Sequence, residues 1–373
     1  MLGANPNRLH IIHKVIQSGS LFILHLKGIY MLTLDEKKVR KGKAVGLPYV
    51  GSKKKISKKI VEIIKQNFGT DKTVYDLFGG GGAITAELLI NDMNVVYNEI
   101  DKSVCDMFCT VLVEDRDWLK TLIVSREEFM AIREKDIKSV DDELKLLVNS
   151  FGNDRKSYLY SKELSNLKYN LAKQIIDIDD VFSGYKQTDA YKNAVKQSER
   201  LGQLEQLGRL QQLGRLQQLQ KLDLLEVNNK DYRDYSDISN SIIYLDPPYE
   251  NSIGYIDEKS RKTSKEKYEK IRNYLIEHDE VEKIIVDDIE YKLGKNKNNK
   301  NRMYEKDLYG VFKSKDFYDW AYEMSKNNIV LISSYEISDP RFEVVYEFKT
   351  ARSTLQSGNA GKRYEKLFMV EMA

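Results

Sequence analysis

The chain has 373 residues, of which 41% are hydrophobic and 31% are charged, and its formal net charge at pH 7 is +3. This length accommodates one large catalytic domain and an additional module, and the charged fraction argues against a membrane protein. Cys105 and Cys109 cannot build a disulfide framework and match no zinc-binding spacing. We therefore expect no metal site, no membrane partner and a reducing, cytoplasmic compartment.

The first 42 residues contribute no recognisable element of the fold. Residues 21–24 (LFIL) are apolar but too few to span a bilayer, and no cleavage site of a signal peptide follows them. We interpret residues 1–42 as a poorly ordered leader, with Met31 as an alternative translation start.

Helix and strand patterns then alternate. Residues 53–68 carry apolar side chains at helical spacing. Residues 73–78 (TVYDLF) are typical of a buried strand, residues 79–82 are all glycine, and residues 83–90 (AITAELLI) are typical of a helix. A second strand is expected over residues 94–100, followed by a helix that contains both cysteines. This order predicts a βαβ unit in a parallel sheet.

The next segment, residues 113–225, has a mainly polar and helical pattern. Ser125 and Glu128 form a candidate capping box at the start of one helix. Residues 201–222 repeat Leu at every third position, a spacing that moves Leu around an α-helix instead of keeping it on one stripe. The repeat predicts either a helix with Leu on several faces or a small repeat stack, serving as a spacer or as a surface for DNA or another partner.

Strand patterns return near the end of the chain, and the last two suit an antiparallel hairpin: residues 241–245, 328–333, 342–348 and 366–370. The basic stretch 256–307 lies between the first two of these strands. We interpret it as an insertion, either a solvated, partly disordered loop or an arm that contacts DNA phosphates.

The glycine turn at residues 79–82 lets the backbone bend between strand and helix and approach a ligand closely, with the free N–H groups of the helix facing that ligand. No Lys-Ser or Lys-Thr follows, as a P-loop requires, and the third glycine of the dinucleotide motif is missing. Glu99 ends the next strand, where an acid can accept hydrogen bonds from both ribose hydroxyls of an adenosine-bearing cofactor. Asp101 is the competing acid.

Residues 242–249 (IIYLDPPY) end a hydrophobic strand with Asp246, Pro247, Pro248 and Tyr249. The two prolines fix the backbone and remove two N–H donors, so the Asp246 carboxylate and the Pro247 carbonyl remain as acceptors. Two fixed acceptors can hold both hydrogens of an exocyclic amino group and direct its nitrogen at a methyl donor. Tyr249 offers a ring on which an extruded base can stack.

An Asp-Pro-Pro-Tyr motif after a strand, with the FGGGG turn earlier in the chain, resembles the Dam-like, phage-type family of adenine-specific N6 DNA methyltransferases. The resemblance implies an α/β fold with a Rossmann-like class I methyltransferase sheet, mostly parallel with an antiparallel hairpin at its end. Residues 43–112 and 226–373 would form the catalytic domain, and residues 113–225 an inserted, mainly helical target-recognition domain. The implied activity is site-specific methyl transfer from S-adenosyl-L-methionine to N6 of a flipped adenine in double-stranded DNA.

The resemblance also implies roles for individual residues. Residues 48–56 (PYVGSKKKI) are similar to the family's N-terminal cofactor motif, and residues 231–235 (DYRDY) to the pair that flanks the cofactor adenine. The implied cofactor site contains Tyr49, Lys53, Asp76, Phe78, Gly79, Gly81, Glu99, Asp231, Tyr232 and Asp246. The implied DNA contacts are Lys53, Asn153, Arg155 and Lys156. The family has Asp at the position of Glu99, and the stretch 256–307 is not part of its pattern.

Other activities agree less well with the motifs. Cytosine C5 methylation requires a Cys beside a Pro, and neither cysteine has such a neighbour. N4-cytosine methyltransferases usually carry Ser before Pro-Pro-Tyr, and methyltransferases of RNA adenine or protein glutamine usually carry Asn. N4-cytosine methylation and a catalytically silent DNA-binding homologue remain the alternatives. We expect a monomer with a cognate restriction endonuclease as one candidate partner.

Overall fold

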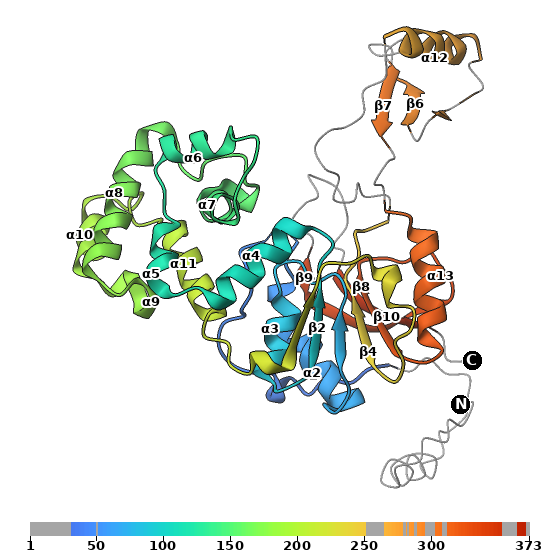
Figure 1. Cartoon of the computed structure of the whole chain (residues 1–373), viewed down its shortest axis with the longest axis horizontal. Coiled ribbons are helices and arrows are strands. Elements are labelled where there is room, and N and C mark those ends of the chain that lie inside the picture. Colours follow the sequence, from blue (N-terminus) through green and yellow to red (C-terminus); the bar gives the residue numbers. More distant parts are fainter. Residues whose placement is uncertain are drawn as a thin grey trace, which may run out of the picture.

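The structure is a computed structural model that describes residues 31–49, 51–250, 265–278, 281, 283–286, 289–294, 303–307, 312–352 and 364–370. Its centre is a seven-stranded sheet with strand order β3-β2-β1-β4-β8-β10-β9 (Figure 1). These strands are β1 (Val74–Asp76), β2 (Val95–Asn98), β3 (Leu225–Asn228), β4 (Ile242–Leu245), β8 (Ile329–Ser334), β9 (Phe342–Arg352) and β10 (Tyr364–Val370). The first five in this order are parallel, whereas β10 is antiparallel to both β8 and β9. The expected fold class is therefore confirmed, and only β3 was not predicted.

Helices cover both faces of the sheet. Along β4, Ile242 and Tyr244 pack with helices α2 (Ser57–Phe68) and α3 (Ala83–Ile90). The alternate residues Ile243 and Leu245 pack on the opposite face with α13 (Ser314–Ser325). Successive side chains of a strand point to opposite faces, so a strand covered on both sides reads as a continuous apolar run. This explains why the pattern IIYL predicted a buried strand.

The position of β1 determines where a ligand can bind. Strand β1 pairs with β2 on one side and with β4 on the other, so the strand order reverses between β1 and β4. In parallel sheets the crevice at the carboxyl ends of such strands is the usual binding site. The glycine turn follows β1 and the Asp-Pro-Pro-Tyr segment follows β4, so the two motifs lie beside each other at this crevice.

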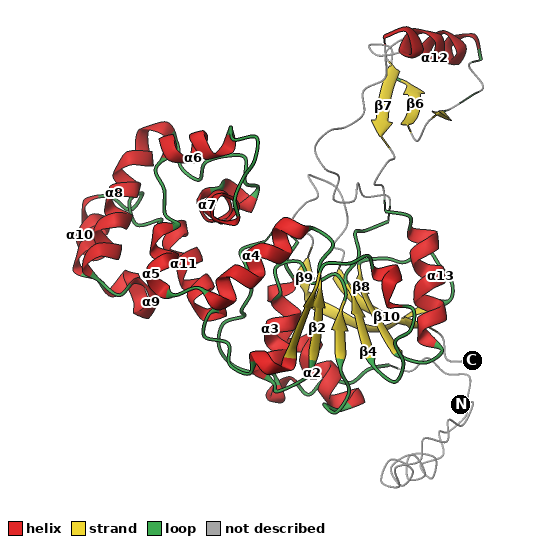
Figure 2. Ribbon diagram, in the orientation of Figure 1, coloured by secondary structure: helices red, strands yellow, loops and turns green. Residues whose placement is uncertain are grey.

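A lobe of helices lies to one side of the sheet (Figure 2). After α4 (Lys102–Val113), its helices are α5 (Arg116–Thr121), α6 (Arg126–Arg133), α7 (Val140–Asn149), α8 (Lys162–Ile178), α9 (Val181–Gly184), α10 (Asp189–Gln197) and α11 (Glu205–Leu216). Ser125 caps α6 by accepting the Glu128 N–H, as its spacing predicted. The reciprocal capping box is found instead at Ser139 and Asp142, at the start of α7.

Residues 205–216 of the Leu repeat form helix α11, at the centre of this lobe. Leu207, Leu210, Leu213 and Leu216 are all fully buried in α11. Helix α11 contacts α4, α5, α7 and α9, so apolar neighbours surround it on several sides. A period of three is tolerated here because Leu is buried on whichever side it falls. Of the two expected arrangements, the helix with Leu on several faces is the one observed.

Part of the expected leader belongs to the fold. Leu32 is buried and its N–H donates to Val345 O on β9 at 2.9 Å. The Arg40 guanidinium forms an ion pair with Glu87 on α3 at 2.8 Å. The expectation of a poorly ordered segment is therefore wrong for residues 31–42, whose isolated contacts leave no periodic pattern in the sequence. Residues 1–30, including the apolar residues 21–24, lie outside the described residues.

The basic stretch also contains secondary structure that we did not expect. Helix α12 (Lys265–Glu277) and a three-stranded antiparallel sheet of β5 (Ile284–Val286), β6 (Ile289–Leu293) and β7 (Met303–Asp307) share a small core. That core is formed by Ile271, Leu275, Tyr291 and Met303. The described parts of residues 256–307 are therefore a small folded module. Residues 256–264 and 295–302 lie outside the described residues.

Within the described part of the chain, no helix combines the length and the apolar composition that a membrane span requires. Among the same residues, no three His, Cys, Asp or Glu side chains are grouped as metal ligands would be. Cys105 is buried, Cys109 is partly buried, and both are free thiols.

The central position of α11 predicts unequal effects of substitutions within the repeat. Leu213→Ala should lower the free energy of unfolding by about 2–5 kcal/mol, because it leaves a cavity at a fully buried site. Leu222→Ala, at a position of the same repeat that is 38% exposed, should change it by less than about 0.5 kcal/mol. Urea denaturation of both variants measures the difference. Equal losses would show that α11 does not pack as described.

Candidate active site

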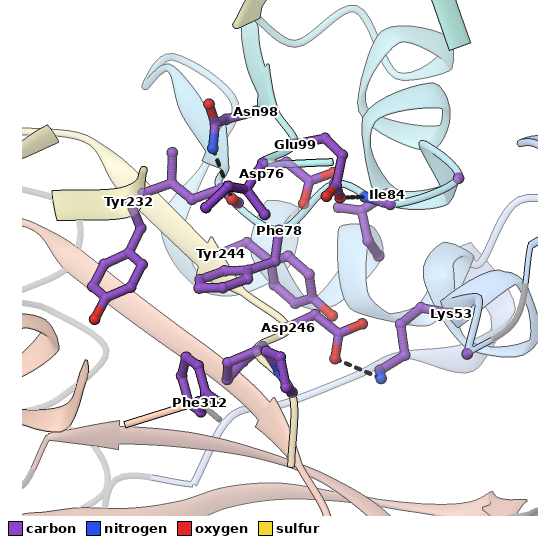
Figure 3. Close-up of a pocket in the computed structure, with 18 of the residues that line it drawn as sticks. Lys53, Asp76, Phe78, Ile84, Asn98, Glu99, Tyr232, Tyr244, Asp246 and Phe312 are labelled. Carbon is purple, nitrogen blue, oxygen red and sulfur yellow. Dashed lines mark hydrogen bonds and ion pairs between the residues drawn. The ribbon is translucent and has the colours of Figure 1, made fainter. Parts of the chain in front are cut away.

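A cavity of about 640 Å³ opens at the carboxyl ends of β1 and β4 (Figure 3). It is lined by every residue that the sequence analysis assigned to catalysis or to the cofactor: Tyr49, Lys53, Asp76, Phe78, Gly79, Gly81, Glu99, Asp231, Tyr232, Asp246, Pro247, Pro248 and Tyr249. Gly51, from the same N-terminal motif, lines it as well. Cavities of this size hold cofactor-sized ligands. The structure thus brings these residues together, while their individual roles remain predictions.

The glycine turn is too tightly packed for side chains. A Cβ added at Gly79 would lie 2.3 Å from the ring of Tyr97, and one at Gly81 would lie 2.8 Å from Cβ of Tyr49. Gly82 precedes α3 with a left-handed φ of +69°, which glycine adopts without strain. Glycine is therefore required at this turn both for its backbone angle and for close packing, and the turn presents bare backbone to the cavity.

The carboxylate of Glu99 is fixed beside the glycine turn by two backbone hydrogen bonds. One carboxylate oxygen accepts the Gly80 N–H at 2.8 Å and the other accepts the Asp101 N–H at 2.9 Å. Burial raises the pKa of Glu99 to about 7 in spite of these hydrogen bonds. Each oxygen keeps a second lone pair for a ligand hydroxyl. The competing acid Asp101 is the N-cap of α4, where its side chain accepts the Ser103 N–H, and it does not line the cavity.

Asp76 accepts two hydrogen bonds from Thr85, a contact that the sequence did not predict. Its Oδ2 accepts both the hydroxyl of Thr85 at 2.7 Å and the N–H of Thr85 at 3.2 Å. Asp76 ends β1 and Thr85 lies in the first turn of α3, so these bonds fix the two ends of the glycine turn. Burial raises the pKa of Asp76 to about 7. Its geometry supports a role in positioning the turn.

Aromatic rings form one wall of the cavity. Phe78 and Tyr232 lie 5.6 Å apart between ring centroids, and Phe312 packs edge-on against Phe78 at 6.3 Å. Asp231 caps the short helical turn that carries Tyr232 and pairs with Arg233 at 2.8 Å, and this hydrogen bond lowers the pKa of Asp231. The pair Asp231 and Tyr232 is thus held rigidly beside the glycine turn.

Asn98 is a buried residue of the site that the sequence analysis missed. Its amide donates to Leu77 O at 3.1 Å and to Lys230 O at 3.0 Å, and its carbonyl accepts the Lys230 N–H at 3.0 Å. Asn98 therefore ties the ends of β1 and β2 to the segment before Asp231. Its place directly before Glu99, as a polar residue at the end of an apolar strand, is the signal that could have identified it.

Partly buried Asp246 forms an ion pair with buried Lys53, and Figure 3 shows the two side chains pointing toward each other. The Lys53 ammonium lies 2.6 Å from Oδ1 of Asp246 and 3.4 Å from Oε1 of Glu365, and its side chain is only 9% exposed. Burial favours the neutral amine, but the charges of Asp246 and Glu365 outweigh it and hold the pKa of Lys53 above its ordinary value. This burial supports a cavity role for Lys53, and the DNA contact implied by the sequence stays a prediction.

The environment of Asp246 affects its own ionisation. Burial raises its pKa to about 6, the Lys53 ammonium opposes this, and Glu365 adds to it. Tyr249 is 36% exposed, with its ring centroid 5.6 Å from the Lys53 ammonium and 4.9 Å from that of Tyr335. The cavity therefore combines a fixed acceptor with an accessible aromatic ring.

The expected DNA contacts other than Lys53 lie away from the cavity, in the loop between α7 and α8. Arg155 donates to Glu143 at 2.8 Å and to Ser103, in the first turn of α4, at 3.3 Å. Lys156 is exposed, whereas Oδ1 of Asn153 is buried with no hydrogen-bond partner among the described residues. The loop thus reaches the catalytic part through Arg155.

Removing the Lys53 ammonium should destabilise the fold in a pH-dependent way. Lys53→Met leaves the partly buried Asp246 and the buried Glu365 as neighbouring carboxylates without a cation, so we expect a loss of about 3–5 kcal/mol at pH 8. A carboxylate whose pKa is higher in the folded state than in the unfolded state gains stability as the pH falls. The loss should therefore shrink at pH 5, as measured by urea denaturation.

The next residue provides a matched control. Lys54 donates only to Leu47 O among the described hydrogen bonds, and burial together with Arg215 and Arg209 lowers its pKa to about 8. Lys54→Met removes a cation that has no carboxylate partner among the described residues, so its effect at pH 8 should be much smaller. Equal losses in the two variants would contradict the structural importance of the Lys53 ion pair.

Comparison with known proteins agrees with this geometry. The family model described as D12 class N6 adenine-specific DNA methyltransferase matches residues 49–282, which include the glycine turn, Glu99, the helical lobe and the Asp-Pro-Pro-Tyr segment. No curated protein matches the chain. Because the match covers more than half of the sequence, the chain belongs to the D12 class of N6 adenine-specific DNA methyltransferases.

Proposed function

We propose that this protein transfers the methyl group of S-adenosyl-L-methionine to N6 of an adenine extruded from a specific site in double-stranded DNA. The observation that supports the proposal is that Asp246 and Pro247 line the same cavity as the glycine turn and Glu99. Two acceptors for an amino group and a nucleoside-binding wall then face one cavity.

The cavity suits this cofactor chemically. Glu99 can accept from ribose hydroxyls, since each of its oxygens has one N–H donor and a free lone pair. The glycine turn lines the cavity with backbone alone, and Phe78 with Tyr232 offers an apolar wall for an adenine ring. When bound, S-adenosyl-L-methionine supplies a methyl group that is activated by its positively charged sulfur.

The protein's own residues hold the target amine. Lys53 holds Oδ1 of Asp246, which leaves Oδ2 to accept one N6 hydrogen, while the Pro247 carbonyl accepts the other. The two prolines keep these acceptors in place, so that the nitrogen lone pair is directed at the methyl group. Tyr249 stacks on the extruded base and offsets part of the cost of unstacking it.

The helical lobe would contact the DNA. Arg155 and Lys156 lie on a loop that reaches the first turn of α4, and α4 begins just after Glu99. Arginine and lysine at such a place can contact phosphates or base edges next to the extruded adenine. We also propose that the protein acts as a monomer, since one chain provides all of the described cavity walls.

The direct test is methyl transfer from tritiated S-adenosyl-L-methionine to unmethylated DNA, followed by nucleoside analysis. N6-methyladenine is the expected product. N4-methylcytosine would overturn the substrate base, and no incorporation with the cofactor still bound would favour a catalytically silent DNA-binding homologue.

Asp246→Asn should lower kcat by about 10²–10³-fold. The amide has no negative charge with which to stabilise the positive charge that forms on the amine in the transition state. Cofactor affinity, measured by titration calorimetry, should change by less than about threefold. Asp136→Asn, at an exposed aspartate of the helical lobe, is the control and should keep full activity. An Asp246→Asn variant with the original kcat would refute the proposed mechanism.

Glu99→Gln should weaken cofactor binding by roughly tenfold or more, since hydrogen bonds to a charged acceptor contribute about 1.5–3 kcal/mol. At saturating cofactor its kcat should remain close to the original value. Because the pKa of Glu99 is about 7, cofactor affinity of the unaltered protein should rise between pH 6 and pH 8, as the carboxylate forms. The Gln variant should lose this pH dependence, and retention of it would assign the titration to another group.

A further inference from the structure

A second carboxylate lies behind the ion pair of the active site. Glu365, in the last strand β10, is 2% exposed and accepts a hydrogen bond from the Ser333 hydroxyl of β8 at 2.8 Å. Its Oε1 lies 3.4 Å from the Lys53 ammonium, which itself lies 2.6 Å from Asp246. Ser333, Glu365, Lys53 and Asp246 thus form a continuous chain of contacts that ends at the cavity.

Glu365 is costly to bury unless its charge is used. A buried carboxylate needs a partner, and the hydroxyl of Ser333 alone would be served equally well by an uncharged glutamine. The neighbouring positions Leu367 and Phe368 are buried and apolar, as expected for a core strand. The negative charge of Glu365 therefore calls for an explanation beyond the packing of β10.

Counting charges supplies that explanation. Lys53 and Asp246 alone are a neutral pair, in which the ammonium cancels the carboxylate that faces the target. With Glu365 the group carries two carboxylates and one ammonium, a net charge of −1. The proposed reaction moves positive charge from the sulfonium to N6, and such a path is favoured by a fixed negative site.

We propose that Glu365 is a positioning residue that neutralises Lys53, so that Lys53 can orient Asp246 without cancelling its charge toward the target amine. This inference rests on the proposed function of Asp246. Ser333 holds Glu365 in the orientation that faces Lys53.

The test is Glu365→Gln in the full-length protein, assayed for methyl transfer with tritiated S-adenosyl-L-methionine. Glutamine keeps the size of the side chain and an acceptor for Ser333, and removes only the charge. We expect kcat to fall by about 10–100-fold, with cofactor affinity changed less than about twofold. Glu62→Gln, at a buried glutamate of α2 that pairs with Lys65 and lies outside the cavity, should leave kcat unchanged.

The pH profile separates this role from a structural one. The titratable groups that face Asp246 are Lys53, Glu365, Asp76, Tyr244 and Tyr249. Glu365 raises the pKa of Asp246, so its removal makes Asp246 easier to ionise. If ionised Asp246 is the active form, the acid limb of the kcat profile should move to lower pH in Glu365→Gln. A loss of kcat with no movement of this limb would contradict the proposal.

A double variant tests whether Glu365 acts through Lys53. In a Lys53→Met background there is no ammonium left to neutralise, so adding Glu365→Gln should cost little further activity. Independent, multiplicative losses would overturn the proposal. Ser333→Ala keeps the charge of Glu365 and should lose less activity than Glu365→Gln; a loss of equal or greater size would show that geometry, not charge, is what Glu365 provides.

Methyl transfer by the unaltered protein separates a failure of the proposed function from a failure of the role of Glu365. If it transfers no methyl group to DNA, the proposed function fails, whatever Glu365 does. If it methylates adenine and Glu365→Gln keeps the original kcat and pH profile, only the role of Glu365 is refuted.

Discussion

The parallel pairing of β1 with β4 is the contact on which the active site depends. In this pairing Asp76 lies opposite Tyr244, so the glycine turn and the Asp-Pro-Pro-Tyr segment emerge at the same edge of the sheet. The chain between these strands contains α3, β2, α4 and the whole helical lobe. Motifs that are distant in sequence thus become the two walls of one cavity, and both strands need apolar cover on both faces to remain there.

The same crevice collects two buried acids and one partly buried acid, all with pKa values above their ordinary range. Asp76, Glu99 and Asp246 all have raised pKa values, and burial is the main cause in each case. Perturbed groups that cluster in a cavity are typical of functional sites, because a fold under selection for stability alone would avoid them. A bound cation or a set of hydroxyl donors would stabilise the ionised carboxylates, which agrees with the cofactor that we propose.

Much of the fold could be predicted because its signals are local. Six of the seven strands of the main sheet, the helix after the glycine turn and the Asp-Pro-Pro-Tyr segment follow from short apolar runs and turn residues. Strand β3 was missed because its side chains are only partly buried and its pattern LEVN is weak. Residues 31–42 were missed because single contacts such as Leu32 to Val345 produce no periodicity.

The charged contacts of the site join residues from distant segments and could not be predicted from the sequence. Lys53 and Asp246 were assigned from their own motifs, but their contact depends on the pairing of distant strands. Glu365 and Ser333 face each other across β10 and β8, and nothing within either strand marks them as partners. The order of the strands, which no single segment encodes, determines which buried polar residues meet.

A short loop that contains Gly46 connects the helical lobe to the glycine turn. Gln212 of α11 donates to Gly46 O at 2.5 Å, and the next residue, Leu47, donates its N–H to Gly81 O at 2.7 Å. Gly46 has a φ of +130°, and a Cβ there would lie 2.8 Å from Gly81 O, so no side chain fits between the loop and the glycine turn. The Leu repeat therefore does more than separate two domains. By burying α11 at the centre of the lobe it fixes Gln212 against this loop, and the position of the lobe is set relative to the turn that lines the cavity.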